Sequence, residues 1–336
     1  MRTLPQRTWC ALATGRVGES VVAALLACLI AGTASAEPYP SRPLRMVVPF
    51  TPAGATDVLA RMVGDALGKR LGQPIIIENR PGAGGNIGAR LVAKAPADGY
   101  TLLMAPTSIY AIAMTLYKDP GFDVVRDFAP VSLVANALHV LVVNADVHAG
   151  TLKDLLVLAR QTPGGLTVAS QGTGTVSHLE AVMLQQMAGI QMVHVPYKGS
   201  APAVLDLLAG RVQVMFDSVA STLPHIRADK LTPIGVPTPQ RVSVLPEVPT
   251  LDESGLTGYR AESWLGILVP AATPQIVIDR LNRELVAILA DAKMREALIE
   301  RGFQPQSSTP EQLARRIREE IVSWGKVVKA SGATVE

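Results

Sequence analysis

A strand that turns through glycine into a helix is written in residues 46–57, Met-Val-Val-Pro-Phe-Thr-Pro-Ala-Gly-Ala-Thr-Asp, and again in residues 167–178, Thr-Val-Ala-Ser-Gln-Gly-Thr-Gly-Thr-Val-Ser-His. The start of a helix leaves backbone N–H groups without intrahelical partners, and these groups together with the helix dipole favour an anion. Two such turns in separate lobes can close on one negatively charged ligand from opposite sides. The pair of turns therefore indicates a receptor for an organic acid.

Residues 1–36 have the pattern of an export signal. Three arginines flank the start of an apolar run over 21–31, and Ala-Ser-Ala at 34–36 supplies a small-residue cleavage site. The apolar run is shorter than the ~20 residues that a membrane span needs, so we expect a cleaved leader and an exported, soluble protein. Leu-Leu-Ala-Cys at 25–28 also loosely resembles a lipoprotein site, which leaves lipid anchoring at Cys28 as a minor alternative.

The composition outside this leader excludes several classes of protein. Both cysteines lie in the leader, so the remainder needs no disulfide, which suits a chain with a large core of its own. Three arginines against one glutamate give the leader a net charge of +2 out of the total of +3, so the remainder carries about +1. Because basic runs are absent, aromatic residues are few and acids alternate with bases, the sequence indicates no nucleic-acid partner.

About 300 residues follow the leader, more than one core usually serves, so two lobes are expected. Short β-rich runs alternate with amphipathic helices, which is typical of an α/β fold with mainly parallel sheets. Strands are expected over 44–49, 74–78, 100–105, 138–143, 166–170, 192–196, 212–216, 231–236 and 264–269, and helices over 56–71, 87–95, 151–160, 177–188, 201–208, 274–290, 292–301 and 310–330. The predicted division is 37–135 plus 265–336 for lobe I and 136–264 for lobe II, joined by a two-crossing hinge.

The first glycine turn supplies one half of the predicted ligand site. Its candidate contacts are Phe50, Thr51, Ala53, Gly54, Ala55 and Thr56. Thr56 also has a side chain suited to cap the helix. Asp57 would repel an anion if it pointed inward, so we assign it to capping or to bracing the loop. An ordinary strand-to-helix turn with a good cap explains the same residues about equally well.

The second turn combines short hydroxyl side chains with glycines that let backbone N–H groups approach a ligand closely. Its candidate contacts are Ser170, Gly172, Thr173, Gly174 and Thr175. Phe216, Asp217 and Lys198 follow other apolar strands of this lobe, at the edge where ligands of open α/β sheets bind. Asp217 is suited to bond a ligand hydroxyl or amine, or to brace its loop. Lys198 attracts an anion on one interpretation and is a solvated surface lysine on the other.

A hydrolase is the competing class, with Ser170 or Ser177 as the nucleophile and His178 as the base. Ser177 and His178 are adjacent, and neighbours on a helix point about 100° apart. The sequence also lacks the G-x-S-x-G elbow of serine hydrolases. It therefore favours a protein that is not an enzyme, with His178 as a packed or hydrogen-bonded residue of the first helical turn.

Nucleotide and metal sites are disfavoured as well. Residues 79–88 are rich in glycine, but Ile87 stands where a dinucleotide fingerprint starting at Gly82 needs its third glycine. We expect this segment to form a second backbone loop at the cleft mouth or a close helix–strand contact, with Gly84 and Thr107 as secondary candidates for ligand contact. The five histidines form no i, i+4 pair and no cysteine follows the leader, so we expect neither a metal nor a cofactor.

A series of ordered motifs runs through the chain after the leader. They are Tyr-Pro-Ser-Arg-Pro at 39–43, Val-Pro-Phe at 48–50 with Gly54 and Thr56-Asp57, Glu-Asn-Arg-Pro-Gly-Ala-Gly-Gly at 78–85, Ala-Asp-Gly-Tyr at 97–100, Gly-Thr-Gly at 172–174 with His178, Val-Pro-Tyr-Lys-Gly at 195–199 and Pro-Glu-Val-Pro-Thr at 246–250. Together they resemble the tripartite tricarboxylate transporter receptors, also called the Bug family of periplasmic solute-binding proteins.

This resemblance implies a two-lobed, type II-like periplasmic-binding-protein fold that closes on a carboxylate and delivers it to a membrane carrier. The family typically holds the carboxylate with backbone groups and ordered waters from one glycine turn in each lobe. The implied partners are a small carboxylate and the membrane subunits of a tripartite tricarboxylate transporter, and we expect a monomer. The family commonly has two glycines in the first turn, and Ala53 stands where the first would be. If that position needs a positive φ, alanine is strained there and the turn takes a different path.

The leading hypothesis is capture of a small carboxylate between residues 50–57 and 170–178. A receptor that presents its carboxylate-bound form to a sensor kinase would use the same site and stays open, as does, at lower weight, an exported serine hydrolase. The ligand classes left open are dicarboxylates, tricarboxylates, acidic amino acids and aromatic acids. Candidate stacking partners are few, namely Phe50, Tyr110 and Phe216, so a small aliphatic acid is mildly favoured.

Overall fold

The computed structural model describes residues 39–333, so the predicted leader and Cys28 lie outside the described residues. The chain is divided into two units at residue 41, and every strand and helix of the described residues belongs to the second unit, residues 42–336. Within the described residues, no helix combines the length and the apolar character needed to cross a membrane.

The second unit alternates strands with helices over most of its length. The strands are β1 (Leu44–Val48), β2 (Ile75–Asn79), β3 (Thr101–Pro106), β4 (Phe128–Ala137), β5 (His139–Asn144), β6 (Thr167–Ser170), β7 (Val193–Pro196), β8 (Val214–Ser218), β9 (Leu231–Gly235), β10 (Ser263–Pro270) and β11 (Phe303–Pro305). The helices are α2 (Ala55–Leu71), α3 (Asn86–Ala93), α4 (Ala113–Leu116), α5 (Val124–Asp127), α6 (Leu152–Gln161), α7 (Val176–Ala188), α8 (Ser200–Leu208), α9 (Val219–Ile226), α10 (Gln275–Ala290), α11 (Ala292–Ile299) and α12 (Pro310–Ser331). A 3₁₀ turn (Ala83–Gly85) precedes α3, and a π-helical turn (Ser108–Ile112) precedes α4.

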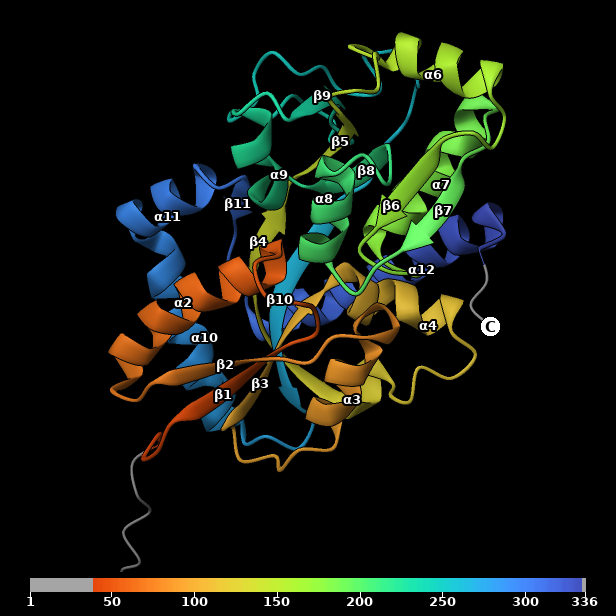
Figure 1. Ribbon diagram of the computed structural model, residues 1–336. Coiled ribbons are helices and arrows are strands. Elements are labelled where there is room, and N and C mark those ends of the chain that lie inside the picture. Colours follow the sequence, from red (N-terminus) through yellow and green to blue (C-terminus); the bar gives the residue numbers. More distant parts are fainter. Residues whose placement is uncertain (1–38, 334–336) are drawn as a thin grey trace, which may run out of the picture. The chain divides into compact units, whose positions relative to one another are not determined.

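The strands form two mixed sheets flanked by helices (Figure 1). The first sheet has the order β11-β4-β10-β3-β1-β2 and the second has the order β7-β6-β8-β5-β9. In each sheet one strand that leads into a glycine turn, β1 or β6, is parallel to both of its neighbours. By contrast, β10 and β5 are antiparallel to theirs. The α/β prediction is confirmed, but the sheets are less parallel than predicted, because the strands that pass between them enter in the opposite sense.

The chain crosses between the two sheets at two places. Strand β4 ends in the first sheet at Ala137, and β5 begins in the second sheet at His139, with only Leu138 between them. The return follows β9 and an irregular segment over 236–262, after which β10 enters the first sheet. Because β10 pairs antiparallel with β4, and Ser263 lies opposite Ala137, the two crossings lie side by side.

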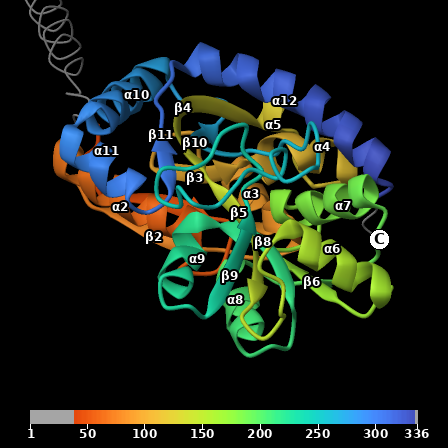
Figure 2. The same cartoon turned by 90° about the horizontal axis from the view of Figure 1, so that it is seen from above.

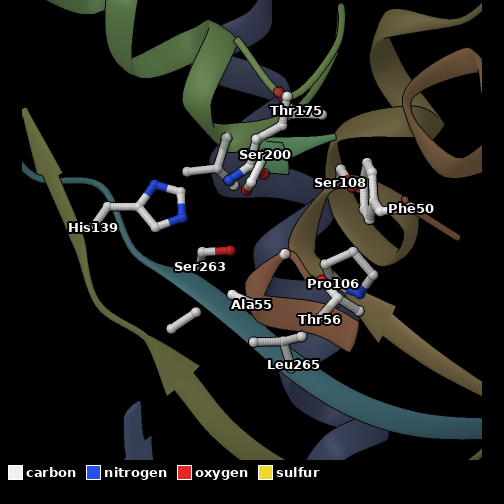
Figure 3. Close-up of a pocket in the computed structure, with 14 residues that line it drawn as sticks. Phe50, Ala55, Thr56, Pro106, Ser108, His139, Thr175, Ser200, Ser263 and Leu265 are labelled. Atoms are coloured by element: carbon white, nitrogen blue, oxygen red, sulfur yellow. The ribbon is translucent and has the colours of Figure 1, made fainter. Parts of the chain in front are cut away.

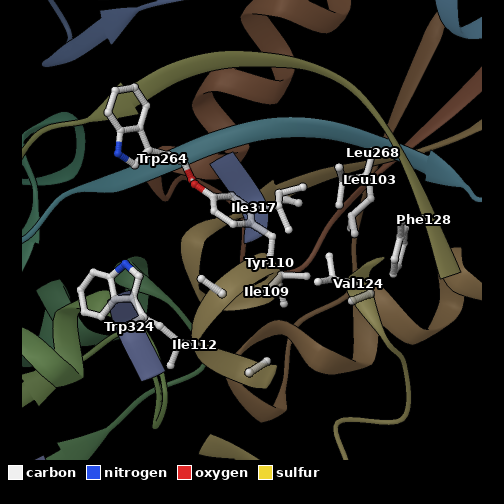
Figure 4. Packing of buried hydrophobic residues seen from close by; sticks show 14 of the residues in the cluster. Leu103, Ile109, Tyr110, Ile112, Val124, Phe128, Trp264, Leu268, Ile317 and Trp324 are labelled. Carbon is white, nitrogen blue, oxygen red and sulfur yellow. The ribbon is translucent and has the colours of Figure 1, made fainter. Parts of the chain in front are cut away.

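The core of the first sheet contains a buried hydrogen-bond network formed by Tyr110, Thr107 and Trp264. Tyr110, which is fully buried, donates its hydroxyl to the backbone carbonyl of Trp264 at 3.0 Å (Figure 4). Thr107 Oγ1 bonds the same hydroxyl at 3.0 Å and accepts from the Trp264 N–H at 2.8 Å. Burial raises the pKa of Tyr110 far above its ordinary value. The side chains of Tyr110 and Thr107 therefore serve the core.

Helices from the end of the chain cover the first sheet. In the view from above, α10, α11 and α12 lie along its outer side (Figure 2). Arg70 near the end of α2 bonds Glu284 on α10 at 2.7 Å, which ties the two helices together across 214 residues of sequence. The C-terminal helices thus complete the part of the molecule that the N-terminal strands begin.

Candidate functional site

A narrow cavity lies between the two sheets, where helix starts from both sides meet (Figure 3). It is lined by Phe50, Gly54, Ala55, Thr56, Pro106, Ser108, Ala137, His139, Gln171, Thr175, Val176, Ser200, Ser263 and Leu265. A water-sized sphere has about 20 Å³ in which its centre can move, which is room for about one water molecule. The two sides of the cavity are therefore close together in this structure.

The start of α2 forms one wall of the cavity. Its N-cap is Gly54, which makes no side-chain cap hydrogen bond, and the first intrahelical bond is donated by the Val58 N–H to the Gly54 carbonyl. Thr56 was predicted to cap this helix, and that prediction is wrong, because the helix begins one residue earlier and places Thr56 inside its first turn. The backbone N–H groups of Ala55 and Thr56 make no hydrogen bond with any described residue.

Two more helix starts face the first from the second sheet. Thr175 is the N-cap of α7: its Oγ1 accepts from the His178 N–H at 3.4 Å and donates to the Gly172 carbonyl at 2.7 Å. Gly199 is the N-cap of α8 and makes no side-chain cap bond, so that Ser200 stands at the first helical position. The cavity therefore collects three helix N-termini, from α2, α7 and α8.

The residues that line the cavity do not balance the positive partial charges of these three helix N-termini. Within the described part of the chain, no Asp, Glu, Lys or Arg lines the cavity, and His139 is its one ionisable residue. The N-terminus of a helix carries about +0.5 of an elementary charge, and a site closed off from water screens that charge weakly. Nothing in the lining neutralises the three helix ends, so the cavity is suited to an anion.

Asp217 lies behind this lining. It is fully buried on β8, and its Oδ1 accepts from Gln171 Nε2 at 2.5 Å, Ser200 Oγ at 2.8 Å and Ser218 N at 2.7 Å. Burial raises the pKa of Asp217, and these donors act in the opposite direction. Asp217 thus orients two residues that line the cavity, Gln171 and Ser200, and does not line it itself.

A buried ion pair stands at another edge of the cavity. His139 Nδ1 lies 2.8 Å from Glu180 Oε2, and the two side chains are 4% and 0% exposed. Burial opposes the charge of the imidazole, but the Glu180 carboxylate outweighs it, and the pKa of His139 is raised above its ordinary value. The ring of His139 projects from β5 toward Ser200 and Ser263 (Figure 3).

A second cavity, the outer groove, lies next to the first. Its lining residues are Phe50, Gly82, Ala83, Gly84, Gly85, Tyr117, Gln171, Gly172, Thr173, Pro196, Tyr197 and Lys198, and its volume is about 300 Å³. It shares Phe50 and Gln171 with the inner cavity. A path that leads outward from the inner cavity is therefore bordered by the glycine-rich segments 82–85 and 172–173 and by the exposed Lys198.

The predicted contacts fall into three groups. Those that line the inner cavity are Phe50, Gly54, Ala55, Thr56 and Thr175. Those that line the outer groove are Phe50, Gly84, Gly172, Thr173 and Lys198. Those that line neither are Thr51, Ala53, Ser170, Gly174, Phe216, Asp217 and Thr107. Phe216 stacks on Tyr259 instead, with ring centroids 6.0 Å apart, so Phe50 is the one predicted stacking residue that reaches either cavity.

The first turn keeps the left-handed backbone expected of glycine. Ala53 has φ +67°, and its N–H donates to Asp57 Oδ2 at 3.0 Å. Arg61 and Asn79 also bond the Asp57 carboxylate, which faces them and does not line either cavity. Ala53 therefore adopts the strained conformation that was expected if this position needs a positive φ, and its N–H is held by Asp57.

The two serines of the hydrolase alternative are both fully buried and line neither cavity. Ser177 Oγ donates to the Phe216 carbonyl at 2.6 Å, and Ser170 Oγ bonds His194 Nε2 at 2.7 Å. His178 bonds neither serine, because its Nδ1 accepts from the Gly174 N–H at 3.3 Å and its ring stacks on His194 at 4.3 Å. The pairing of serine with His178 that this alternative requires is thus not present among these residues.

Sequence reasoning missed nine lining residues of the inner cavity. They are Pro106, Ser108, Ala137, His139, Gln171, Val176, Ser200, Ser263 and Leu265. Gln171 and Val176 belong to the glycine turn at 167–178, and Ser200 follows a glycine at a third helix start, so the same signal could have found them. The other six reach the cavity through the sheet topology and the strand crossings.

Comparison with known proteins identifies one family of receptors. A family model described as the tripartite tricarboxylate transporter family receptor matches residues 59–333. The chain is 42% identical over 291 residues to a UPF0065 protein in the tcbD-tcbE intergenic region of Pseudomonas sp. (strain P51), covering 86% of each chain. It is 37% identical over 308 residues to the protein BugT of Bordetella pertussis, covering 91% of this chain and 94% of BugT.

Solved structures extend the comparison. Rpa4515 of R. palustris with adipate is 36% identical, with a TM-score of 0.87 over 88% of this chain and 100% of that one. The periplasmic binding protein BugD is 34% identical, with a TM-score of 0.86 over 89% of this chain and 100% of that one. MatC of Rhodopseudomonas palustris with bound malate is 32% identical, with a TM-score of 0.82 over 86% of this chain and 100% of that one.

Proposed function

Because the chain belongs to the tripartite tricarboxylate transporter family of receptors, we propose that it captures a small organic carboxylate in the inner cavity and delivers it to a membrane carrier of that transporter type. It acts by binding and not by catalysis. Two similar receptors hold the carboxylates adipate and malate, which supports this class of ligand for the present chain.

One observation carries the proposal: three helix N-termini converge on a cavity whose described lining contains no carboxylate. The N–H groups of Ala55 and Thr56 make no hydrogen bond with any described residue, so they are available as donors to a carboxylate. The hydroxyls of Thr175 and Ser200 already have protein partners, which leaves the backbone as the main source of donors. Backbone donors and water recognise a carboxylate without an arginine clamp.

Ligand entry requires the two sides of the cavity to separate. The free space in the cavity suits about one water molecule, which is less than any organic acid needs. We propose that lobe I, residues 37–135 plus 265–336, and lobe II, residues 136–264, rotate about the two adjacent crossings, and that the ligand stabilises the closed form. Affinity then reflects both the contacts in the cavity and the closing of the outer groove.

The first test is thermal unfolding of ligand-stripped protein from residue 37 onward against a panel of carboxylates. A ligand at 100 times its Kd stabilises the folded state by about 2.7 kcal/mol, which raises the Tm by several degrees in a protein of this size. The matched controls are the uncharged amide and alcohol analogues of each acid. A Tm that rises for an acid and not for its amide supports the proposal, whereas equal shifts or no shift for every acid would contradict it.

A pair of variants tests the site itself. T56D places a carboxylate at the start of α2 inside the cavity, and T56N has nearly the same shape without the charge. Two unit charges roughly 5 Å apart repel by about 3 kcal/mol at an effective dielectric constant of 20, so T56D should weaken binding of the identified acid by about two orders of magnitude. T56N should stay within a few-fold of the natural chain, and equal losses in the two variants would argue against an anion at this helix start.

The partner and the compartment belong to the same proposal. We infer export to the periplasm, presence there as a monomer, and docking of the closed form on the carrier subunits. Deletion of the gene should then abolish uptake of the identified acid while leaving its induction of target genes intact. Loss of gene induction with normal uptake would instead favour a receptor that signals to a sensor kinase.

A further inference from the structure

We propose that His139, held by Glu180, bonds a second carboxylate at the far end of the ligand and so makes the receptor selective for dicarboxylic acids. This inference rests on the proposed function and adds a selectivity residue to the same cavity. The helix start of α2 takes one carboxylate, and His139 takes the other.

The position of His139 is the first support. It begins β5 directly after the crossing from the first sheet, and its side chain is 4% exposed although the ring lines the cavity. Figure 3 shows the ring turned toward Ser263 and Ser200, across the cavity from the start of α2. A ligand group bound at the start of α2 and a group bound at His139 would therefore lie at different ends of one ligand.

The hydrogen bonding of the ring is the second support. Nδ1 is occupied by Glu180 Oε2 at 2.8 Å, whereas Nε2 makes no hydrogen bond with any described residue. The hydroxyl of Ser263, toward which the ring turns, likewise makes no hydrogen bond with any described residue, and it lines the same cavity. Polar atoms that line a cavity and have no protein partner are available to a ligand, so Nε2 and the Ser263 hydroxyl can both bond a polar ligand group at this edge of the cavity.

Glu180 determines whether Nε2 of His139 donates or accepts a hydrogen bond. A carboxylate accepts, so Nδ1 carries the proton that bonds Glu180, and a neutral ring would then present a bare lone pair at Nε2. A protonated ring presents an N–H donor and a positive charge at the same atom. Only the protonated form attracts a carboxylate, and the buried Glu180 favours that form.

The surrounding charges support protonation. From α7 the ring meets Glu180, and from β8 the charge of Asp217 acts on it; both raise its pKa, against the effect of burial. From β10 and α2 the ring meets the cavity lining, where no described residue other than His139 itself is ionisable. His178, which is buried, and His194, which is half-buried, both have lowered pKa values and stay neutral near pH 7.

The experiment compares matched pairs of acids by isothermal titration: succinate with butyrate, glutarate with valerate, and adipate with hexanoate. Each pair differs only in the second carboxylate. The natural chain at pH 6 should prefer the dicarboxylate of its best chain length by about 10- to 100-fold, the range expected for a hydrogen bond to a charged group. The preference should decline as the pH rises through the folded pKa of His139, because Nε2 then becomes an acceptor.

Two variants separate the role of His139 from a general effect on folding. H139Q removes the positive charge and should reduce the preference to nearly one. E180Q retains an acceptor for Nδ1 but lacks the charge that supports protonation, so the preference should disappear at a lower pH than in the natural chain. H225Q changes a histidine that lines neither cavity and is the matched control.

The outcomes distinguish this inference from the proposed function. An unchanged preference in H139Q, equal binding of both acids of every pair by the natural chain, or a preference that grows with pH would overturn the role of His139 and leave carboxylate capture standing. Failure of the natural chain to bind any acid of the panel would overturn the proposed function and the inference together. If H139Q does not fold, the pH profiles of the natural chain and of E180Q still decide the question.

Discussion

The hydroxyl of Tyr117 donates a hydrogen bond to the backbone carbonyl of Thr173 at 2.9 Å. Tyr117 follows α4 beside the first sheet, and Thr173 belongs to the glycine turn after β6 in the second sheet. Gly84 lies in the same contact, because a Cβ built there would stand 2.7 Å from the Thr173 carbonyl oxygen. The two sides of the outer groove are therefore in direct contact with each other at Tyr117, Gly84 and Thr173.

Removal of this hydrogen bond should weaken ligand binding without lowering the stability of either side of the cleft. The variant Y117F loses a bond worth about 1 kcal/mol that joins the two sides and would break in the proposed opening, so the Kd should rise about five-fold, mainly through faster dissociation. Stopped-flow and calorimetric titration measure both quantities. Y197F is the control, because the hydroxyl of Tyr197 bonds Asp206 on its own side of the cleft. A similar loss of affinity in Y197F would show that the effect is not specific to closure.

A methyl group at Gly84 should hinder closure more strongly. The Cβ of G84A would lie 2.7 Å from the Thr173 carbonyl oxygen and 2.8 Å from the Tyr117 hydroxyl, closer than real Cβ contacts allow. We expect at least a ten-fold rise in Kd. G72A is the matched control: Gly72 has φ +74° against +62° for Gly84, but nothing lies within 4 Å of its Cβ. Both variants should lose about 1 kcal/mol of stability to the left-handed backbone, and equal affinities in the two would contradict the steric role of Gly84.

Replacement of Ala53 by glycine should relieve strain in the first turn. A non-glycine residue at φ +67° costs about 1 kcal/mol, and A53G recovers this while adding freedom to the unfolded chain, for a net stabilisation of about 0.5 kcal/mol. Urea unfolding should show a higher midpoint with an unchanged m-value. Ligand affinity should not change, because the turn already has the path that glycine favours. Destabilisation by A53G would mean that the methyl group makes a contact that outweighs the strain.

The stability of the second glycine turn should depend on pH through His178. Burial lowers the pKa of His178 to about 4, and the neighbouring His194 acts in the same direction. An unfolded histidine titrates near 6.5, so the unfolded chain binds the proton first; this stabilisation is fully present above about pH 6.5 and is lost as the pH falls through 4. The loss amounts to roughly 3 kcal/mol. The free energy of unfolding should therefore fall between pH 6.5 and 4, and less steeply in H178Q, whose amide oxygen can still accept from Gly174. An equal slope in both proteins would assign the effect to other groups.

Local sequence signals predicted much of the fold. The helix expected at 56–71 is Ala55–Leu71, and the strand expected at 138–143 is His139–Asn144, because each has a clear periodicity or an unbroken apolar run. Strand β4 was missed: Pro130, Ser132 and Asn136 interrupt any alternation, and pairing with β10 and β11 on either side determines the strand. Helix α9 was missed because Pro224 lies inside it.

The candidate site was predictable to the same extent as the backbone around it. Glycine turns are visible in a sequence because few other residues adopt their conformations, and five predicted contacts do line the inner cavity. The opposite wall, with Ala137, His139 and Ser263, depends on two chain crossings that meet only after β4 and β10 have paired. No short-range pattern encodes that pairing, so the sequence showed His139 only as the one polar residue of an otherwise apolar strand.

The place of β10 in the first sheet bears on the order in which the chain can fold. β10 separates β3 from β4 and β11 forms the edge beyond β4, so the first sheet cannot be completed until residue 305 has left the ribosome. The second sheet, by contrast, is encoded without interruption between 139 and 235. The strands β3 and β4, which are synthesised first, therefore remain unpaired along one edge until β10 has been synthesised. We expect the second sheet to fold early and the first sheet to fold last.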